Sequence, residues 1–278
     1  MIKIREQIKN SKKIVIKVGT SSLMKASGKI HLERIAKLAQ TICELQAEGR
    51  NLVLITSGAI GVGMDRLNLA VRPTVMKEKQ AAAAVGQCEL MSIYSKMFWQ
   101  YDQVVAQILL TVDNVRSERD RQNVINTFDA LMQMNVVPIV NENDTVSTIE
   151  ISVEDAMAFN ENDSLSAIVA NLIGADLLII LSDIDGFYDA DPKTNPNSKR
   201  ISVVRDLTSE MECFAGGAGS QFGTGGMVTK LRAAKIANDA GAHMILASGE
   251  DPHVIKRIID GNDEGSIFVS EKKYNEEL

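Results

Sequence analysis

Short apolar runs alternate along this chain with longer stretches in which apolar residues recur every three or four positions. The short runs are rich in Val, Ile and Leu, as strands commonly are. They lie at residues 13–19, 51–57, 104–110, 136–141, 176–183 and 243–248. Several are apolar at successive positions, which is typical of a parallel strand buried on both faces. We therefore expect one sheet that is covered by helices on both sides.

The longer stretches predict the helices that cover this sheet. Apolar side chains of residues 30–49 share one helical face, and the stretch stops at Gly49, a residue type favoured after helices. The other helical stretches are residues 77–99, 117–135, 227–241 and 251–261. In the last of them Asp251 is the expected N-cap and Pro252 the first helical residue. We expect an α/β fold with a single domain over residues 1–278, a three-layer αβα sandwich with a mainly parallel central sheet.

Composition and charge narrow the class of protein. Of the 278 residues, 45% are hydrophobic and 24% charged, and 30 basic against 36 acidic residues give a net charge of −6. No basic run could follow a phosphate backbone, so we expect no nucleic-acid partner. The first apolar run is interrupted at Lys17, which argues against a secretory signal or a membrane span there. We expect a cytoplasmic protein that does not bind membranes.

Cysteines and histidines supply no local motif. Cys43, Cys88 and Cys213 are far apart and form no CxxC, so neither a disulfide framework nor a zinc site is supported. We expect reduced thiols in the core. The three histidines are equally scattered, and none lies beside a candidate nucleophile.

Polar residues follow several of the predicted strands, where ligands of parallel sheets collect. Lys17 lies inside an apolar run and is followed by Gly19, Thr20 and Ser21. It either extends its ammonium along the strand end into water or faces an anion, and the small residues after it favour the anion because their backbone N–H groups are accessible. In the same way "TSGAIGVG" places Ser57 at a helix start that is either a plain cap or a carboxylate site.

Two acidic clusters share the letters N-E-N-D. The first, residues 141–144, follows a strand and is either a polar turn or a binder of an amino group, with Asp144 best placed to pair an ammonium. The second, residues 160–163, precedes an apolar helix, which Asn162 or Asp163 could simply cap.

The stretch "GTGGMVTK", Gly223 to Lys230, combines a glycine-rich loop with a lysine one turn inside the next helix. It is not the Walker pattern, because no Gly directly precedes Lys230. The loop suits contact with a phosphate, and the alternative is a plain connection between elements.

These stretches together resemble the glutamate 5-kinases of the amino acid kinase superfamily. The similar segments are "VIKVGTSSL", "ITSGAIGVG", "AAVGQ", "RQNVINTF", "VVPIVNEND", "NDSLSA", "GADLLIILSDIDGFYDADP" and "GTGGMVTKLRAAKIA". They occur in the order of that family, from about residue 12 to about residue 250. The resemblance implies an amino acid kinase fold, like that of carbamate kinase. It also implies ATP-dependent phosphorylation of the γ-carboxylate of L-glutamate, the first step of proline biosynthesis.

The resemblance also implies roles for individual residues. Lys17 and Lys230 would flank the transferring phosphoryl group, and Asp163 would hold the two lysines. Ser57, Asp144 and Asn162 would bind glutamate. The ATP-binding positions would be Lys17, Gly19, Thr20, Ser182, Asp183, Thr224, Gly225, Gly226, Met227, Val228, Thr229 and Lys230. Mg²⁺ would be held mainly by the nucleotide phosphates, without a dedicated metal site of protein ligands.

The resemblance also predicts binding partners, and the sequence departs from the family's pattern in some segments. The resemblance implies a homo-oligomer, a dimer or a tetramer, and proline as a feedback inhibitor. The family's usual G-D-N-D motif is replaced here by residues 160–163, so Glu161 carries a longer carboxylate, and the segment 146–159 is long and acidic. We expect no carboxy-terminal PUA domain. Two other functions stay open: a sister kinase acting on aspartate, N-acetylglutamate, carbamate or a nucleotide, and an amino acid sensor without catalysis.

Overall fold

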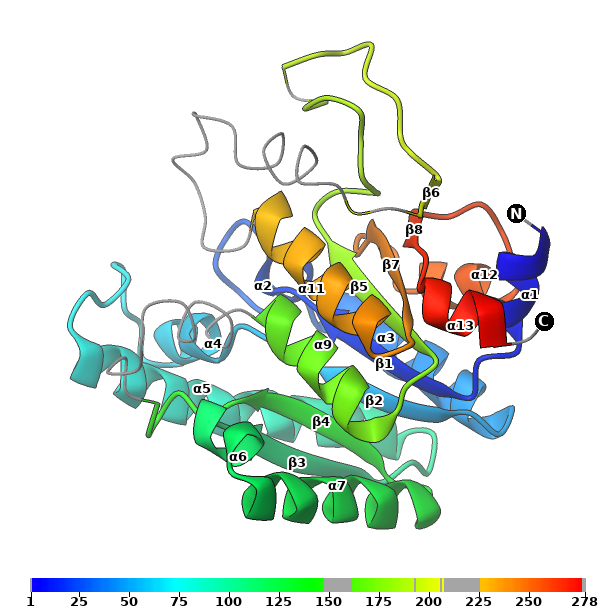
Figure 1. Ribbon diagram of the computed structural model, residues 1–278. Helices are drawn as coiled ribbons and strands as arrows, with labels where there is room; N and C mark the ends of the chain where they lie inside the picture. Colours follow the sequence, from blue (N-terminus) through cyan, green and yellow to red (C-terminus); the bar gives the residue numbers. More distant parts are fainter. Residues whose placement is uncertain (1, 148–161, 193, 206, 208–225, 277–278) are drawn as a thin grey trace.

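An eight-stranded sheet forms the centre of the protein (Figure 1). The computed structural model describes residues 2–147, 162–192, 194–205, 207 and 226–276. The strands are β1 Lys13–Val18, β2 Asn51–Ile55, β3 Val105–Leu110, β4 Val137–Glu142, β5 Leu177–Ser182, β6 Val203–Val204, β7 His243–Ser248 and β8 Ser266–Phe268. They lie in the order β3-β4-β2-β1-β5-β7-β8-β6, and every neighbouring pair is parallel except β7 and β8.

Helices cover both faces of this sheet. They are α1 Ile2–Lys9, α2 Thr20–Leu23, α3 Leu32–Ala47, α4 Ala59–Arg66, α5 Met76–Trp99, α6 Val112–Arg116, α7 Glu118–Gln133, α9 Asn162–Ile173, α11 Met227–Asp239, α12 Val254–Ile259 and α13 Glu271–Glu276. Helices α7, α9 and α11 lie on the near face in Figure 1, and α3, α5 and α12 lie behind the sheet. The predicted three-layer αβα fold with a mainly parallel sheet is confirmed. Within the described residues, no helix is both long and apolar enough to cross a membrane.

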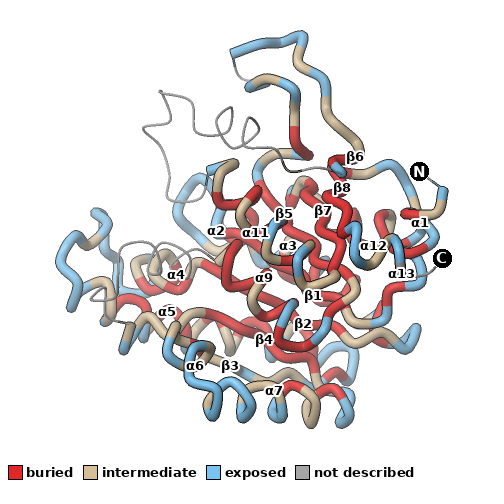
Figure 2. Tube along the Cα trace, viewed as in Figure 1, coloured by how far each residue is buried: buried red, intermediate tan, exposed pale blue. Residues whose placement is uncertain are grey.

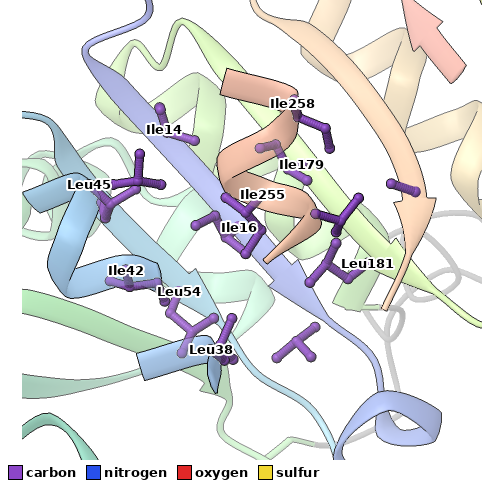
Figure 3. Close-up of a cluster of buried hydrophobic side chains, with 14 of the residues drawn as sticks. Ile14, Ile16, Leu38, Ile42, Leu45, Leu54, Ile179, Leu181, Ile255 and Ile258 are labelled. Atoms are coloured by element: carbon purple, nitrogen blue, oxygen red, sulfur yellow. The ribbon is translucent and has the colours of Figure 1, made fainter. Parts of the chain in front are cut away.

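Two hydrophobic cores follow from the two faces of the strands, because successive residues of a strand point to opposite sides. Ile14 and Ile16 of β1 pack beneath α3 and α12, as Figure 3 shows, whereas Val15 between them belongs to the core beneath α7, α9 and α11. Burying one such side chain completely stabilises the fold by about 1.5–3 kcal/mol. Figure 2 shows that the burial is concentrated in the sheet and in the inner sides of its helices.

The predicted elements are found with small shifts at their ends, and three expectations need correction. Strands β6 and β8 were not predicted, because runs of two and three residues carry no periodic signal. Helix α12 begins at Val254 and not beside Asp251, whose Oδ1 accepts the N–H of His253 at 3.3 Å in the preceding turn. Cys43 is half-buried and Cys88 is exposed, so the expectation of core thiols is wrong for Cys88; Cys213 lies outside the described residues.

Candidate active site

The carboxyl ends of four neighbouring strands meet at one edge of the sheet. Strands β4, β2, β1 and β5 are consecutive in the sheet and parallel, so the polar residues at their ends come together there. Helices α9 and α11 pack against each other over the central strands (Figure 1). The first turns of both helices reach this edge, as the contacts below show.

Three buried ionised side chains form a charge cluster at this edge: Lys17, Asp163 and Lys230. Lys17 follows Val15 by two residues on β1, so both side chains point to the same face of the sheet, toward α9 and α11. Its Nζ lies 2.7 Å from Asp163 Oδ1, and Lys230 Nζ lies 3.3 Å from Asp163 Oδ2. The three residues are only 9%, 3% and 6% exposed, in chain order. Two ammonium groups and one carboxylate leave this buried cluster with one net positive charge, which suits an anionic ligand.

Asp163 is kept ionised by its neighbours. Burial by itself would raise the pKa of its carboxyl, but the charges of Lys17 and Lys230, with hydrogen bonds from Lys17 and Thr229, hold that pKa below its usual value. The Thr229 hydroxyl donates to Asp163 Oδ2 at 2.8 Å. In the described residues, the side chains of Asn162 and Asp163 make these tertiary contacts, and neither is seen to form a capping hydrogen bond to the backbone of α9.

The loops after β1 and β2 lie against each other beside the charge cluster. Gly19 lies beside Lys17: a Cβ at Gly19 would be 3.4 Å from Lys17 Nζ, an ordinary contact distance. Gly58 has φ +90°, a conformation that favours glycine, and it is the N-cap of α4, next to the side chain of Thr20. The predicted small residues Gly19, Thr20 and Ser57 are therefore close to the charge cluster, as their positions after neighbouring strands indicated.

A second group of polar side chains is neutral and forms what we call the amide chain: Gln87, Asn141, Asn162 and Ser57. Asn141 Nδ2 donates to Gln87 Oε1 at 2.9 Å. Asn162 Nδ2 donates to Ser57 Oγ at 2.7 Å and to Asn141 Oδ1 at 3.4 Å. Asn162 Oδ1 and Gln87 Nε2 are buried, and within the described part of the chain neither has a hydrogen-bond partner. The amide chain therefore ends in a free acceptor at Asn162 and a free donor at Gln87.

The amide chain crosses the edge of the sheet from one helical layer to the other. Val137, Ile139 and Asn141 alternate along β4, and the first two belong to the core beneath α3 and α5, so Asn141 points toward α5, which carries Gln87. Asn162 belongs to α9 in the opposite layer. The charge cluster, by contrast, stays within the layer of α9 and α11.

Asp144 lies beyond the end of β4 with two charged neighbours. Burial raises the pKa of the Asp144 carboxyl, and the positive charge of Arg72 opposes that rise. Glu142 is also affected: burial and the nearby Asp144 raise its pKa, while a hydrogen bond from the Ser147 hydroxyl, 2.7 Å long, acts in the other direction. In the described residues, no hydrogen bond joins Asp144 to Ser57 or Asn162, and Asp144 follows Asn141 by three residues.

The predicted nucleotide-binding residues are partly described. Ser182 ends β5, and its hydroxyl donates to Asp183 Oδ1 at 2.9 Å. Gly226 is the N-cap of α11, and Met227, Val228, Thr229 and Lys230 form its first turn. Thr224 and Gly225 lie outside the described residues, as do Glu161 and most of the segment 146–159. In the described part of the chain, no group of three or more His, Cys, Asp or Glu side chains could hold a metal ion.

Three residues beside the predicted site had no role assigned to them from the sequence. Asn141 was visible as part of N-E-N-D, and Gln87 as the last letter of "AAVGQ", but nothing local says that the two side chains meet. Arg72 lies in a turn without periodicity, and only the structure places its charge near Asp144. The roles of the predicted residues themselves stay predictions.

Sequence comparison shows what the whole chain is similar to. Residues 12–248 match the amino acid kinase family. The glutamate 5-kinase of Clostridium perfringens is 53% identical over 97% of this chain and 99% of its own length. A glutamate 5-kinase of Listeria monocytogenes is 52% identical over 97% of both chains, and that of Enterococcus faecalis is 48% identical over 96% of this chain and 97% of its own length.

Solved structures of low sequence identity share the fold. Carbamate kinase from Giardia lamblia bound to AMP-PNP superposes with a TM-score of 0.64 at 16% identity, covering 95% of this chain and 100% of that one. UMP kinase from Bacillus anthracis gives a TM-score of 0.62 at 12% identity, with 94% and 97% covered. At such identities the likeness concerns the fold alone.

Proposed function

The chain belongs to the amino acid kinase family, and on that premise we propose that it is a glutamate 5-kinase, which transfers the γ-phosphoryl group of ATP to the γ-carboxylate of L-glutamate. The observation that carries the proposal is the charge cluster, two buried ammonium groups held on one buried carboxylate at the carboxyl edge of the sheet. Relatives that share about half of its residues over nearly their whole length are glutamate 5-kinases.

Lys17 and Lys230 would stabilise the phosphoryl group during transfer. Phosphoryl transfer depends on alignment and on neutralising charge, so positive groups fixed in a dry site are its main requirement. Asp163 holds both ammonium groups in place, so they need not move when the anionic phosphate binds. Backbone N–H groups of Gly19, Thr20 and the first turn of α11 would add further donors for the phosphate.

No general base is needed on the acceptor side. The γ-carboxyl of glutamate has an ordinary pKa of about 4.3, so it is already ionised at neutral pH. One of its oxygens forms the new bond to the γ-phosphorus while the bond to the β,γ-bridging oxygen breaks, and the products are an acyl phosphate and ADP. The hydroxyl of Thr229, which lies against the charge cluster, is already engaged as a donor to Asp163 Oδ2 at 2.8 Å.

The acceptor would bind between Asp144 and the amide chain. Asp144 supplies a negative charge for the α-amino group, and Asn162 supplies the free oxygen Oδ1. Ser57 would contact a carboxylate of the acceptor at the start of α4, where the helix dipole is favourable. A free amino group is therefore the feature that would separate glutamate from N-acetylglutamate, in which the same nitrogen belongs to an uncharged amide.

The nucleotide would lie along Ser182, Asp183 and the start of α11. Mg²⁺ would arrive with it and neutralise its phosphates. From the family we also propose a cytoplasmic homo-oligomer with one kinase domain over residues 1–278, inhibited by proline. Adding proline to the assay below tests that last point.

The test is ATP consumption with Mg²⁺ and hydroxylamine, which traps an acyl phosphate as a hydroxamate. L-Glutamate, aspartate and N-acetylglutamate are compared in parallel, with 2-hydroxyglutarate as the analogue that lacks the amine. Hydroxamate from glutamate, and at least tenfold less from each of the others, supports the proposal. Product from N-acetylglutamate alone would move the assignment to a sister kinase. Binding of glutamate without product would favour a sensor.

A further inference from the structure

We propose that Gln87 is a positioning residue of the acceptor site, which acts through Asn141 to keep the oxygen of the Asn162 amide directed at the acceptor. The proposal rests on the proposed function, because it concerns the same acceptor. Gln87 belongs to α5, in the helical layer opposite to α9, and within the described residues no hydrogen bond joins its side chain to the charge cluster.

The hydrogen bonds of the amide chain have a direction. A side-chain amide accepts at its oxygen and donates at its nitrogen, so a chain of amides keeps one polarity from end to end. Gln87 presents Oε1 to Asn141, which turns the Asn141 oxygen toward Asn162. Asn162 consequently uses its nitrogen for Asn141 and Ser57, and its oxygen is left over.

This polarity suits a substrate with an amino group. The unpartnered Asn162 Oδ1 can accept a hydrogen bond from an ammonium, whereas the reversed chain would offer it an NH₂ group and repel it. Asn141 and Gln87 are 2% and 8% exposed, so water cannot readily replace a lost partner in this chain. Removing the Gln87 oxygen would leave the Asn141 nitrogen buried and unpaired, and both asparagine amides would be free to turn over.

Helix α5 is held firmly enough to serve as the support. A Cβ at Gly86 would overlap the carbonyl oxygen of Ala59, and a Cβ at Gly63 would overlap that of Ala82, so the backbones of α4 and α5 are in contact directly beside Gln87. Farther along α5, the Tyr94 hydroxyl lies 2.9 Å from Thr56 Oγ1, at the end of β2. Gln87 is therefore fixed relative to Ser57 and to the strand ends.

The first experiment compares KM values in the hydroxamate assay. We expect Gln87→Met, which keeps the shape and removes the hydrogen bond, to raise the KM for glutamate roughly 10-fold. The KM for ATP should stay within about 2-fold, because the charge cluster lies in the other layer. Gln87→Glu offers only oxygens, so it should bring the KM for glutamate back to within about 3-fold of the wild type. Leu90→Ala, a core residue on the same helix, is the matched control for a loss of stability alone.

Two further readouts separate positioning from packing. Gln87→Met should reduce the preference for glutamate over 2-hydroxyglutarate. In the double variant with Asn141→Leu, Gln87→Met should have no further effect on the KM for glutamate, because the loss of Asn141 already breaks the hydrogen-bonded connection from Gln87 to Asn162. A parallel rise in both KM values, unchanged KM values, or additive effects in the double variant would overturn the proposal.

A last measurement does not depend on the reaction. In ligand-free protein labelled with ¹⁵N-asparagine, Gln87→Met should shift the side-chain amide signals of Asn162, identified by their loss in Asn162→Leu, and Leu90→Ala should not. If the wild type makes no hydroxamate from glutamate, the proposed function is wrong, and unmoved Asn162 signals would then overturn the positioning role separately.

Discussion

Asn162 and Asp163 are neighbours in the first turn of α9, yet they belong to two regions built in opposite ways. Asp163 joins the charge cluster, which is ionised and lies within one helical layer. Asn162 joins the amide chain, which is neutral and crosses the sheet edge to α5. Consecutive helical residues point about 100° apart, so one turn can serve both regions. The charge cluster suits a highly charged phosphate, and the amide chain suits a ligand that must be distinguished by its polar groups.

The sharpest way to break this contrast is to remove a lysine. We expect Lys230→Ala to lower kcat by about 10³-fold, because one of two charges fixed on the phosphoryl group is lost from a dry site. The KM for glutamate should change little. Lys235→Ala, an exposed lysine on the same helix, is the control and should be unaffected. If folded Lys230→Ala protein has unchanged turnover, Lys230 has no role in phosphoryl transfer.

Replacing Asp163 tests whether the charge cluster is held together by its carboxylate. Asp163→Asn leaves two ammonium groups buried side by side, and we expect it to lower the free energy of unfolding by about 3 kcal/mol at neutral pH. An ATP analogue should restore part of that loss in thermal denaturation, since its phosphates replace the missing negative charge.

The same replacement gives a pH dependence of known sign. The pKa of Asp163 is lowered in the folded protein. Its contribution to the free energy of unfolding is therefore fully present above the pKa that it has in the unfolded chain, and it is lost as pH falls through the pKa that it has in the folded protein. The stability difference between wild type and Asp163→Asn should therefore shrink toward acid pH. A difference that grows there would contradict the ion pairs as its source.

Asp144 tests the acceptor side. We expect Asp144→Ala to raise the KM for glutamate roughly 30-fold through loss of a charge-assisted hydrogen bond, with little change for ATP. Because burial raises the pKa of this carboxyl, the wild-type KM for glutamate should begin to rise at a higher pH, on acidification, than an ordinary aspartate would cause. The dependence should be absent in Asp144→Asn. Equal losses for both substrates would make Asp144 a general structural residue.

The smallest expected effect concerns the support behind both regions. Tyr94→Phe removes the hydroxyl that meets Thr56 Oγ1, and we expect the free energy of unfolding to fall by about 1 kcal/mol in urea denaturation. Neither KM should move by more than about 2-fold, because the α4–α5 contact at the glycines remains. A selective rise in the KM for glutamate would mean that Tyr94 also positions the acceptor site.

The fold and the place of the site could be predicted because each depends on local pattern. Apolar runs mark the buried strands, and parallel strands bring the residues after them to one edge, which is how Lys17, Ser57 and Asp144 were chosen. The contacts between elements could not be predicted in this way. Asp163 meets Thr229 across 66 positions and Gln87 meets Asn141 across 54. Contacts between residues so far apart in the sequence depend on how helices and strands pack together, for which a single sequence carries no periodic signal.

The glycine contact between α4 and α5 also affects how this protein can diverge over generations. Any side chain at Gly63 or Gly86 would overlap a backbone carbonyl, so no series of small substitutions can move the two helices apart gradually. The exposed turn around Arg72 has no such restriction. We expect the substitutions that change acceptor preference to accumulate in that turn, whereas the glycines between α4 and α5 should stay the same among relatives.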